Sequence, residues 1–327
     1  MVNSPENWLR KGSLTSYSVN WQRPAKTEEW IFETILKKES YSPYVEYIAF
    51  PWATLIDLLD RNKIESAQIL LNQLDKLEPK RTIIRASSCQ HINMEKYIHL
   101  FEKLQITDLF WSHKRIGLQR IHNIRLHPLA LYPYAFEEYK YSNSEPLNRD
   151  YLVSFVGAYD PECYISKIRD DIINTNKKKY KDIKIIQRDC WHFEAQVYGE
   201  QINLIKQTEA EKQKQKNNFE QFCNILSRTR YSLCPSGSGP NSIRFWESLA
   251  FGCIPVLLSD TLDLPAVVKD YVYIICKEVE YEKFLNNIFF EKKIIDHEFN
   301  CEFRTENFIS EVTSQLFTTD YINKLTA

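Results

Sequence analysis

The 327-residue sequence predicts an α/β fold composed of two Rossmann-like domains that face a central cleft. Two observations support this fold class. In both halves, short apolar segments typical of buried strands alternate with amphipathic helical segments, which is the pattern of a parallel sheet covered by helices. Between the halves, residues 131–150 show no clear periodicity and contain Pro133 and Pro146, as expected of a linker. The length is sufficient for two domains.

In the first half, Thr27 is a predicted helix N-cap, followed by two glutamates in the first turn. The predicted helices span 27–38, the residues after Pro51, and 64–77; the predicted strands span 45–50, 81–86, 109–111 and 121–126. The last three strands lead into His91, His113 and His127. Because ligands of parallel sheets bind at the carboxyl ends of strands, these histidines are candidate site residues. His127 precedes a proline, and we interpret it as shaping a turn.

In the second half, a strand at 151–156 ends at Gly157, and a helix at 163–175 and a strand at 183–187 follow. Segment 206–218 is almost entirely polar and highly charged, which is typical of either a solvated helix or a mobile loop over an acceptor. A final strand is predicted at 271–276, followed by mostly helical segments.

The most informative pattern lies in residues 230–265, which are typical of a strand, a glycine turn, a helix and a second strand. Gly237 and Gly239 lie where the strand turns into the helix, so that backbone N–H groups and the positive helix end point at an anion. Arg244 can pair with a phosphate, and Glu247, one turn further, can accept hydrogen bonds from ribose hydroxyls. The pattern therefore predicts a site for a diphosphate with a sugar attached.

Other interpretations of this pattern, two functional and one purely structural, stay open. Gly237-Ser-Gly239-Pro-Asn-Ser242 is close to the dinucleotide fingerprint, and Asp260 ends the next strand, so an NAD-binding oxidoreductase is one alternative. Ser242 in place of the third glycine and Pro240 after the second both weaken that reading. Arg244 and Glu247 can also form an ordinary solvated pair on a helix. A non-catalytic module that binds a nucleotide or a glycan is the other alternative.

The same window closely resembles the exostosin-type glycosyltransferases, glycosyltransferase family 47. The resemblance rests on Tyr231-Ser-Leu-Cys-Pro-Ser-Gly237, Ser242-Ile-Arg-Phe-Trp-Glu-Ser-Leu249, Gly252-Cys-Ile-Pro-Val-Leu-Leu-Ser-Asp260 and Leu264-Pro265. Weaker similarity extends to Phe155-Val-Gly157 with Ile168-Arg169, and to Ile106-Thr-Asp-Leu-Phe-Trp-Ser-His113. The family often has arginine where this chain has Ser236, so Arg244 is expected to carry more of the phosphate contact.

The resemblance implies a GT-B fold, a nucleotide-sugar donor, inversion at the anomeric carbon, and no required metal or other cofactor. The implied donor-binding residues are Ser236, Gly237, Ser238, Gly239, Asn241, Ser242, Arg244 and Glu247, together with Gly157 and Arg169. The donor is expected to be a UDP-sugar. The expected domains are an acceptor-side domain over 1–145, a nucleotide-sugar-binding domain over 150–305, and a helical tail over 306–327 that can pack back on the first domain. The sequence also lacks an Asp-x-Asp metal triplet, so a helix N-terminus and Arg244 are expected to neutralise the leaving diphosphate.

An inverting transfer needs a base that takes the proton from the acceptor hydroxyl. His113 is the first candidate because it ends a strand and matches the family histidine, and His91 is the second. Asp57 is the third, because burial in an apolar helix would raise the pKa of its carboxyl. A purely structural role is the alternative for each of the three.

Composition excludes several other classes. The formal net charge of −1 gives no electrostatic case for nucleic acid. The eight cysteines form no CxxC pair, so neither a zinc site nor a redox motif is indicated. No apolar run of about 18 residues and no apolar leader occur, which predicts a soluble, cytoplasmic, bacterial or viral-like member of the family that can contact the inner membrane face peripherally. The expected acceptor is a glycan, lipid-linked in one alternative, in lipopolysaccharide or capsule synthesis.

Overall fold

The structure is a computed structural model that describes residues 8–23, 25–38, 42–78, 84–132, 149–190, 195–266, 268, 271 and 273–291. The chain divides into two compact units. Met1–Tyr132 and Asp263–Val267 belong to the first unit, and Pro133–Leu262 and Val268–Phe303 belong to the second. The predicted helical tail at 306–327 and most of the predicted linker lie outside the described residues, so the predicted domain boundaries stay a prediction.

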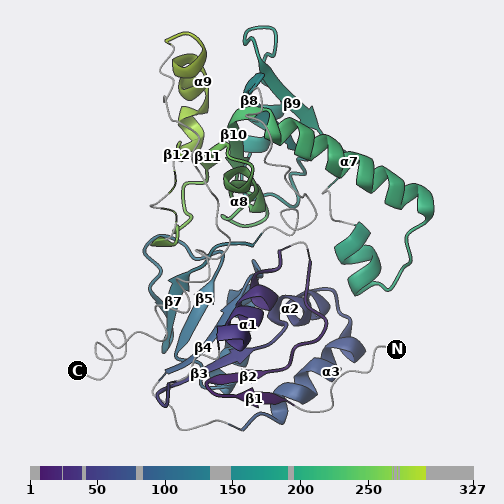
Figure 1. Cartoon of the computed structure of the whole chain (residues 1–327), viewed down its shortest axis with the longest axis vertical. Coiled ribbons are helices and arrows are strands. Elements are labelled where there is room, and N and C mark those ends of the chain that lie inside the picture. The colour runs from purple at the N-terminus through teal and green to yellow at the C-terminus, as the bar shows by residue number, and fades with distance from the viewer. Residues whose placement is uncertain are drawn as a thin grey trace. The chain divides into compact units, whose positions relative to one another are not determined.

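The first unit is built on a seven-stranded sheet in the order β1-β2-β3-β4-β5-β7-β6 (Figure 1). The strands are β1 (Leu9–Lys11), β2 (Leu14–Ser16), β3 (Val45–Ala49), β4 (Ile84–Cys89), β5 (Asp108–Trp111), β6 (Arg120–Ile121) and β7 (Ile124–Pro128). Strands β2, β3, β4, β5 and β7 run parallel, and β1 and β6 pair antiparallel at the two edges. The helices are α1 (Thr27–Lys38), α2 (Trp52–Asp60), α3 (Ile64–Asp75), the 3₁₀ turn η1 (Met94–Tyr97) and α4 (Ile98–Lys103).

The apolar segments of this unit form its core as the sequence predicts. Ile31 and Ile35 of α1 pack on Val45 and Tyr47 of β3, all at most 2% exposed. The predicted helix at 27–38 is confirmed, and the predicted strand at 45–50 is confirmed to within one residue. Strands β1 and β2 were not predicted, because three-residue strands in a polar segment carry no periodic signal.

The second unit is built on a five-stranded, wholly parallel sheet in the order β12-β11-β10-β8-β9. The strands are β8 (Tyr151–Gly157), β9 (Ile183–Gln187), β10 (Thr229–Pro235), β11 (Ile254–Leu258) and β12 (Ile274–Ile275). The helical segments are α6 (Ile168–Ile173), the π-helical η2 (Ala195–Ile202), α7 (Glu209–Ser227), α8 (Ile243–Ala250), the 3₁₀ turn η4 (Glu278–Glu280) and α9 (Tyr281–Phe289).

The order of these strands creates a topological switch point. The chain passes from β8 to β9 on one side, and then crosses to β10 on the other side of β8 (Figure 1). In open parallel sheets, ligands bind at the carboxyl ends of the two strands that flank such a point. Here those strands are β8, which ends at Gly157, and β10, which ends at Pro235.

Two expectations for this unit need adjustment, and one open alternative is decided. The helix expected over 163–175 is regular only over Ile168–Ile173, and the strand expected over 271–276 is reduced to Ile274–Ile275. The charged segment 206–218 belongs mostly to a helix, α7. That helix begins at a capping box in which Thr208 and Glu211 satisfy each other's backbone N–H groups, and this local hydrogen bonding starts a helix that is largely solvated. Within the described residues, no helix has the length and apolarity to span a membrane.

Candidate active site

Two arginine side chains converge on Gly157 at the carboxyl end of β8. A Cβ atom added to Gly157 would lie 3.3 Å from Nη1 of Arg169 and 3.3 Å from Nη1 of Arg244. Arg169 comes from α6 and Arg244 from the first turn of α8, so the two helices that follow β8 and β10 each contribute one cation. Both guanidinium groups also lie on the ring of Phe155, with Cζ 5.8 Å and 4.8 Å from its centroid. Glycine is required here because a side chain would fill the space that the guanidinium groups occupy.

The two arginines are held by different means. Arg169 is 7% exposed and donates from Nε to the Ser236 carbonyl at 2.7 Å and from Nη1 to the Ala158 carbonyl at 3.2 Å. Arg244 donates from Nη2 to the Val156 carbonyl. Its Nε and Nη1 atoms are buried and have no hydrogen-bond partner in the described part of the chain. A buried cationic donor without a partner is costly, so these atoms mark a place where an anion would be stabilised.

The pKa shifts of Arg169 and Arg244 also indicate a buried, positively charged site that would stabilise an anion. Burial, and then the charge of Arg244, lowers the pKa of Arg169 to about 10. Burial also lowers the pKa of Arg244, against the attraction of Glu247. Glu247 is 4% exposed, and its burial raises the pKa of its carboxyl to about 7, although Arg244 acts in the opposite direction. Within the described residues no ion pair of Arg169 or Arg244 with a carboxylate is formed at 4 Å or less, so the site carries excess positive charge.

The predicted glycine turn after β10 is compact. Gly237 N–H donates to the Gly239 carbonyl at 3.0 Å, and neither glycine is among the described glycines with positive φ, which are Gly12, Gly117 and Gly252. Ser242 is the N-cap of α8, and its side chain makes no capping hydrogen bond. The Phe245 N–H donates to the Ser242 carbonyl at 3.0 Å, which leaves the amides of Ile243 and Arg244 as the anion donors of this helix end.

Other predicted donor residues have structural contacts of their own. The Asn241 side-chain oxygen accepts from Nε1 of Trp246 at 2.9 Å, and Ser238 is exposed. The Ser236 hydroxyl donates to Oε1 of Glu278 at 3.2 Å and lies 3.1 Å from the hydroxyl of Ser166. The structure thus brings Gly157, Arg169, Arg244 and the α8 N-terminus together, and directs Asn241 inward.

Two residues at this edge, Ser166 and Glu278, were missed by the sequence analysis. Ser166 also donates to Glu278 Oε1, at 3.0 Å, and the Glu278 N–H donates to Asp260 at 3.1 Å. These contacts connect the loops after β8, β10 and β11. The bonded pairs are 18 to 112 positions apart in the chain, so no local pattern could have related them. Asp260 here caps η4, which is a different role from the ribose contact expected of an NAD-binding carboxylate.

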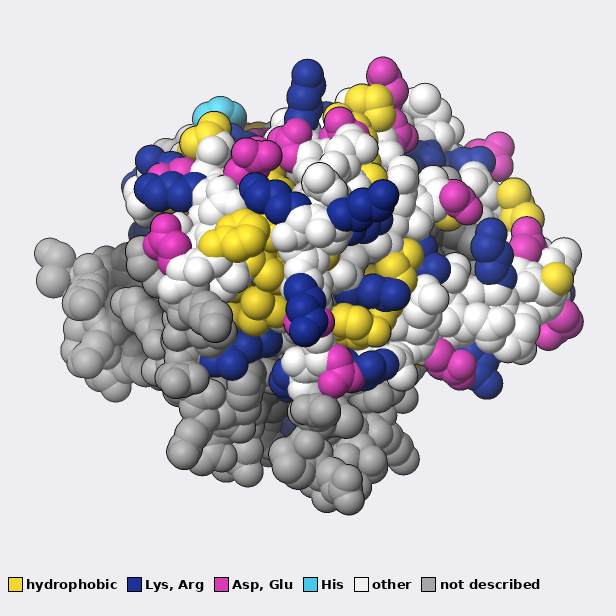
Figure 2. Space-filling model, turned by 90° about the horizontal axis from the view of Figure 1, so that it is seen from above, with side chains coloured by type: hydrophobic (Ala, Val, Ile, Leu, Met, Phe, Trp, Pro, Cys, Tyr) yellow, Lys and Arg dark blue, Asp and Glu magenta, His cyan; other side chains and the backbone are white. Residues whose placement is uncertain are grey.

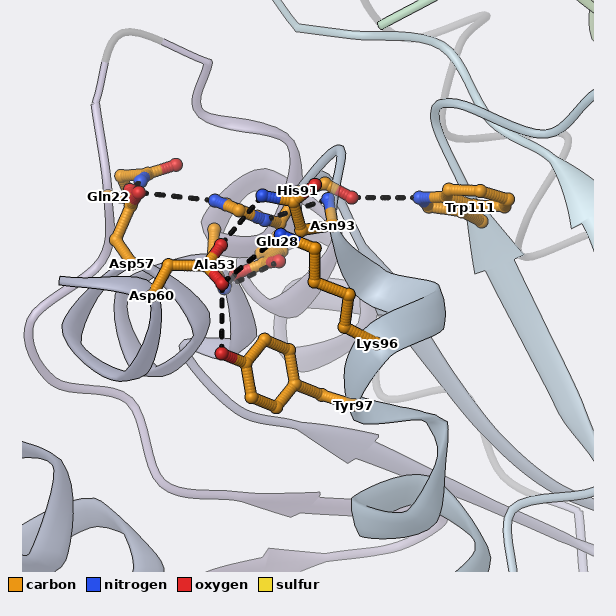
Figure 3. A network of polar contacts seen from close by, with 10 residues as sticks. All are labelled: Gln22, Glu28, Ala53, Asp57, Asp60, His91, Asn93, Lys96, Tyr97 and Trp111. Carbon is orange, nitrogen blue, oxygen red and sulfur yellow. Dashed lines mark hydrogen bonds and ion pairs between the residues drawn. The ribbon is translucent and has the colours of Figure 1, made fainter. Parts of the chain in front are cut away.

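In the first unit, a polar network follows the carboxyl ends of β3, β4 and β5 (Figure 3). His91 Nε2 lies 3.2 Å from Oδ1 of Asp57, and His91 Nδ1 accepts from the Asn93 N–H at 3.0 Å. These contacts define the tautomer with the proton on Nε2, which donates to Asp57. Gln22 donates to the other oxygen of Asp57, and Trp111 donates to the His91 carbonyl at 2.9 Å. The sequence-predicted Asp57 and His91 therefore form one oriented carboxylate–imidazole pair.

Glu28, which the sequence analysis did not select, binds the backbone of the two segments that carry Asp57 and His91. Its carboxyl group is 3% exposed and accepts from the N–H of Ala53, in the first turn of α2 (Figure 3). It also accepts from the N–H of Gln90, after β4. Burial raises the pKa of Glu28 to about 8, although these backbone hydrogen bonds act against it. One buried carboxyl thus holds together the element that carries Asp57 and the loop that carries His91.

His113 lies at the end of β5 and is 5% exposed. Burial, and then the neighbouring His91, lowers the pKa of His113 to about 3, although a backbone hydrogen bond at Gln90 opposes the shift. The imidazole is therefore neutral at physiological pH and a weak proton acceptor. The next residue, Lys114, is 1% exposed and pairs with Asp263, whose N–H donates to the Lys114 carbonyl at 3.0 Å. Among the described residues no group of three or more His, Cys, Asp or Glu side chains is placed to hold a metal ion.

Comparison with known proteins identifies the family. The model of the exostosin GT47 domain matches residues 83–275, which is more than half of the chain and includes both β8 and the 230–265 window. The chain belongs to this family of glycosyltransferases. An oxidoreductase built on Gly237 and Gly239 is thereby disfavoured.

The individual relatives are similar over shorter stretches. Exostosin-1 of Drosophila melanogaster is 27% identical over 124 residues, covering 38% of this chain and 15% of that protein. Exostosin-1c of Danio rerio is 30% identical over 124 residues, covering 38% and 16%. The probable glucuronoxylan glucuronosyltransferase IRX7 of Arabidopsis thaliana is 39% identical over 51 residues, covering 16% and 11%. The chain spans less than one fifth of the length of each.

Among solved structures, the S. aureus MnaA–UDP co-structure covers 91% of this chain and 87% of its own, with 12% identity and a TM-score of 0.36. A putative UDP-N-acetylglucosamine 2-epimerase from Listeria monocytogenes covers 91% and 71%, with 11% identity and a TM-score of 0.26.

Proposed function

We propose that this chain transfers a sugar from a nucleotide-sugar, expected to be a UDP-sugar, to a hydroxyl group of a glycan. The observation that carries the proposal is the pair of guanidinium groups at Gly157. One of them has two buried nitrogens that find no hydrogen-bond partner among the residues the structure describes. Diphosphate oxygens are the acceptors that such forked donors suit best. Family membership supports the same activity.

In the proposed mechanism, Arg169, Arg244 and the N-terminal amides of α8 bind the diphosphate of the donor. Negative charge grows on the diphosphate as the bond to the sugar breaks, and fixed cations stabilise that charge more than the ground state. Glu247 would accept hydrogen bonds from the ribose hydroxyls. This arrangement supplies the charge that a divalent metal supplies elsewhere, and we therefore propose metal-independent transfer. We propose inversion at the anomeric carbon on the family resemblance alone.

For the base we propose Asp57, oriented by His91. Both nitrogens of His91 are already engaged, with Asp57 and with the Asn93 N–H, and the low pKa of His113 makes it a poor proton acceptor. Asp57 retains lone pairs on both oxygens, and the Nε2–H of His91 holds the carboxylate in place. His113, the first candidate from the sequence, is then a buried neutral residue whose pKa is lowered by that burial and by His91. Turnover by Asp57→Asn, His91→Asn and His113→Asn variants ranks the three candidates.

The acceptor and the cellular role are proposed on family grounds alone. We propose a glycan acceptor, lipid-linked in one alternative, and a product in lipopolysaccharide or capsule synthesis in the cytoplasm. Assay of membrane and soluble fractions for donor hydrolysis and transfer tests both the location and the acceptor.

A thermal-shift screen against UDP, GDP, CMP and NAD, with and without EDTA, tests the donor site. We expect one nucleoside diphosphate to stabilise the protein, in the presence of EDTA as in its absence. Arg244→Ala and Glu247→Ala should lose most of that stabilisation. Arg188→Ala is the matched control. Arg188 lies in the same unit and its side chain bonds to Asn218 and Gln221 on α7, while the substitution keeps the backbone N–H that donates to the Gly157 carbonyl at 2.9 Å.

Full stabilisation of both Arg244→Ala and Glu247→Ala by the nucleotide would exclude the proposed donor site. Stabilisation by NAD alone would favour the oxidoreductase. Donor binding without release of the nucleoside diphosphate in the presence of acceptor glycans would favour a non-catalytic binding module.

A further inference from the structure

A basic loop connects α6 to β9 at the edge of the second unit opposite to the candidate donor site. Between Asn176 and Lys184 the chain carries five lysines, at 177, 178, 179, 181 and 184, against one acidic residue, Asp182. The loop precedes the amino end of β9, whereas Gly157 and Pro235 end their strands at the carboxyl edge. The loop is therefore no part of the proposed donor site.

Most of this positive charge is not neutralised. Lys177, Lys178, Lys179 and Lys181 are exposed, and none of them forms an ion pair within the described residues. The side chains of Lys177, Lys178 and Lys181 also make no hydrogen bond there. The formal net charge of the whole chain is −1, so this concentration of lysines is a local feature.

The loop is held in a defined conformation. Asn176 accepts from the N–H of Lys178 with its side chain, at 3.2 Å, and from the N–H of Lys179 with its carbonyl, at 3.0 Å. Tyr180 is buried between the lysines, with its ring 5.0 Å from that of Phe289 and its hydroxyl donating to Asn286 of α9. A buried aromatic anchor thus fixes the backbone that carries the exposed lysines, so that little backbone entropy is lost when they bind a partner.

An exposed aromatic ring completes the surface. Phe290, at the end of α9, is 57% exposed, and Lys179 Nζ lies 5.7 Å from its ring centroid. Figure 2 views the molecule from the side on which this loop lies in Figure 1, and Lys and Arg side chains lie there among exposed hydrophobic and acidic side chains. Lysines beside an exposed aromatic ring are typical of segments that lie on an anionic lipid surface.

We propose that this surface, formed by Lys177, Lys178, Lys179, Lys181 and Phe290, binds the protein to a membrane that contains anionic lipids. The lysines attract the headgroup phosphates, and the Phe290 ring enters the interface between headgroups and acyl chains. Single-stranded nucleic acid is the less favoured polyanion, because it is usually bound by several stacking aromatic rings and arginines, and this surface presents lysines and one exposed ring.

Vesicle co-sedimentation tests the proposal on the full chain. The protein should sediment with phosphatidylcholine vesicles that contain phosphatidylglycerol and not with pure phosphatidylcholine vesicles, and binding should fall as salt rises. Each surface lysine is worth about fivefold in binding, so Lys177→Gln, Lys178→Gln and Lys181→Gln together should weaken it roughly 100-fold. Phe290→Ser should weaken the salt-resistant part of the binding.

The matched control removes three lysines elsewhere in the same unit: Lys212→Gln, Lys214→Gln and Lys216→Gln, all exposed on α7. This variant should retain vesicle binding, and thermal unfolding should show that both triple variants fold. Equal binding of the wild type to both kinds of vesicle, or equal losses in the two triple variants, would overturn the proposal. So would tight binding to a single-stranded oligonucleotide with no binding to anionic vesicles.

Discussion

Replacement of Gly157 by alanine tests whether the carboxyl end of β8 shapes the donor site. The new Cβ would lie 2.9 Å from Cζ of Phe155, a ring that is 1% exposed and on which both guanidinium groups rest. That distance is shorter than a carbon–carbon contact allows, so the ring has to move. The ring is buried, and Arg169 and Arg244 have to move with it.

The expected magnitude follows from these contacts. Overpacking of this kind costs about 1–3 kcal/mol of the free energy of unfolding. In a unit of this size, each kcal/mol lowers Tm by about 2–4 °C. Displacement of one guanidinium group removes a charge-assisted hydrogen bond to the diphosphate, which is worth about 1.5–3 kcal/mol. Affinity for the nucleoside diphosphate should therefore fall about tenfold to a hundredfold.

The assay is thermal unfolding with and without the nucleotide, followed by titration calorimetry. Gly199→Ala is the matched control, because a Cβ added to Gly199 meets no atom within 4 Å. Gly237→Ala is an informative contrast, since its nearest neighbour would be Arg169 Nη2 at 3.7 Å, an ordinary contact. Wild-type Tm and wild-type nucleotide affinity in Gly157→Ala would refute the reasoning.

The remaining predictions concern charge. Glu28 has a pKa of about 8 in the fold against an ordinary 4.5, so the free energy of unfolding should fall as pH rises between these values, and Glu28→Gln should flatten that slope in urea titrations. The pKa of His113 is lowered from 6.5 to about 3, so the free energy of unfolding should fall as pH falls through this window. The imidazole NMR signals of His113 should not titrate between about pH 5 and pH 8. Titration near pH 6.5 would contradict its burial. Arg169→Lys retains the charge, but the lysine side chain cannot reach both the Ser236 and Ala158 carbonyls. Nucleotide affinity should therefore fall while its salt dependence stays unchanged. Calorimetry at two ionic strengths measures both.

Much of the architecture was predictable because its signals are local. The alternation of apolar strands with amphipathic helices predicted two α/β halves, and the 230–265 window predicted a strand, turn and helix that the structure has as β10 and α8. The same window identified the family, because its uncommon residues keep a fixed order. Arg169 and Arg244 could be selected in this way, each from its own short motif.

The tertiary structure alone decided which side chains meet. Parallel β8 and β10 are neighbours although some seventy residues of chain separate them, and only this pairing places Arg169 and Arg244 on the two sides of Gly157. The fold likewise decided the protonation and orientation of the candidate bases. Burial lowers the pKa of His113, and a hydrogen bond from His91 orients the Asp57 carboxylate. Sequence patterns therefore determined the elements and the family, since those depend on near neighbours in the chain. The cation pair, the Ser166–Glu278 contact and the protonation states depend on distances and on solvent exclusion, which exist only once the sheet has formed.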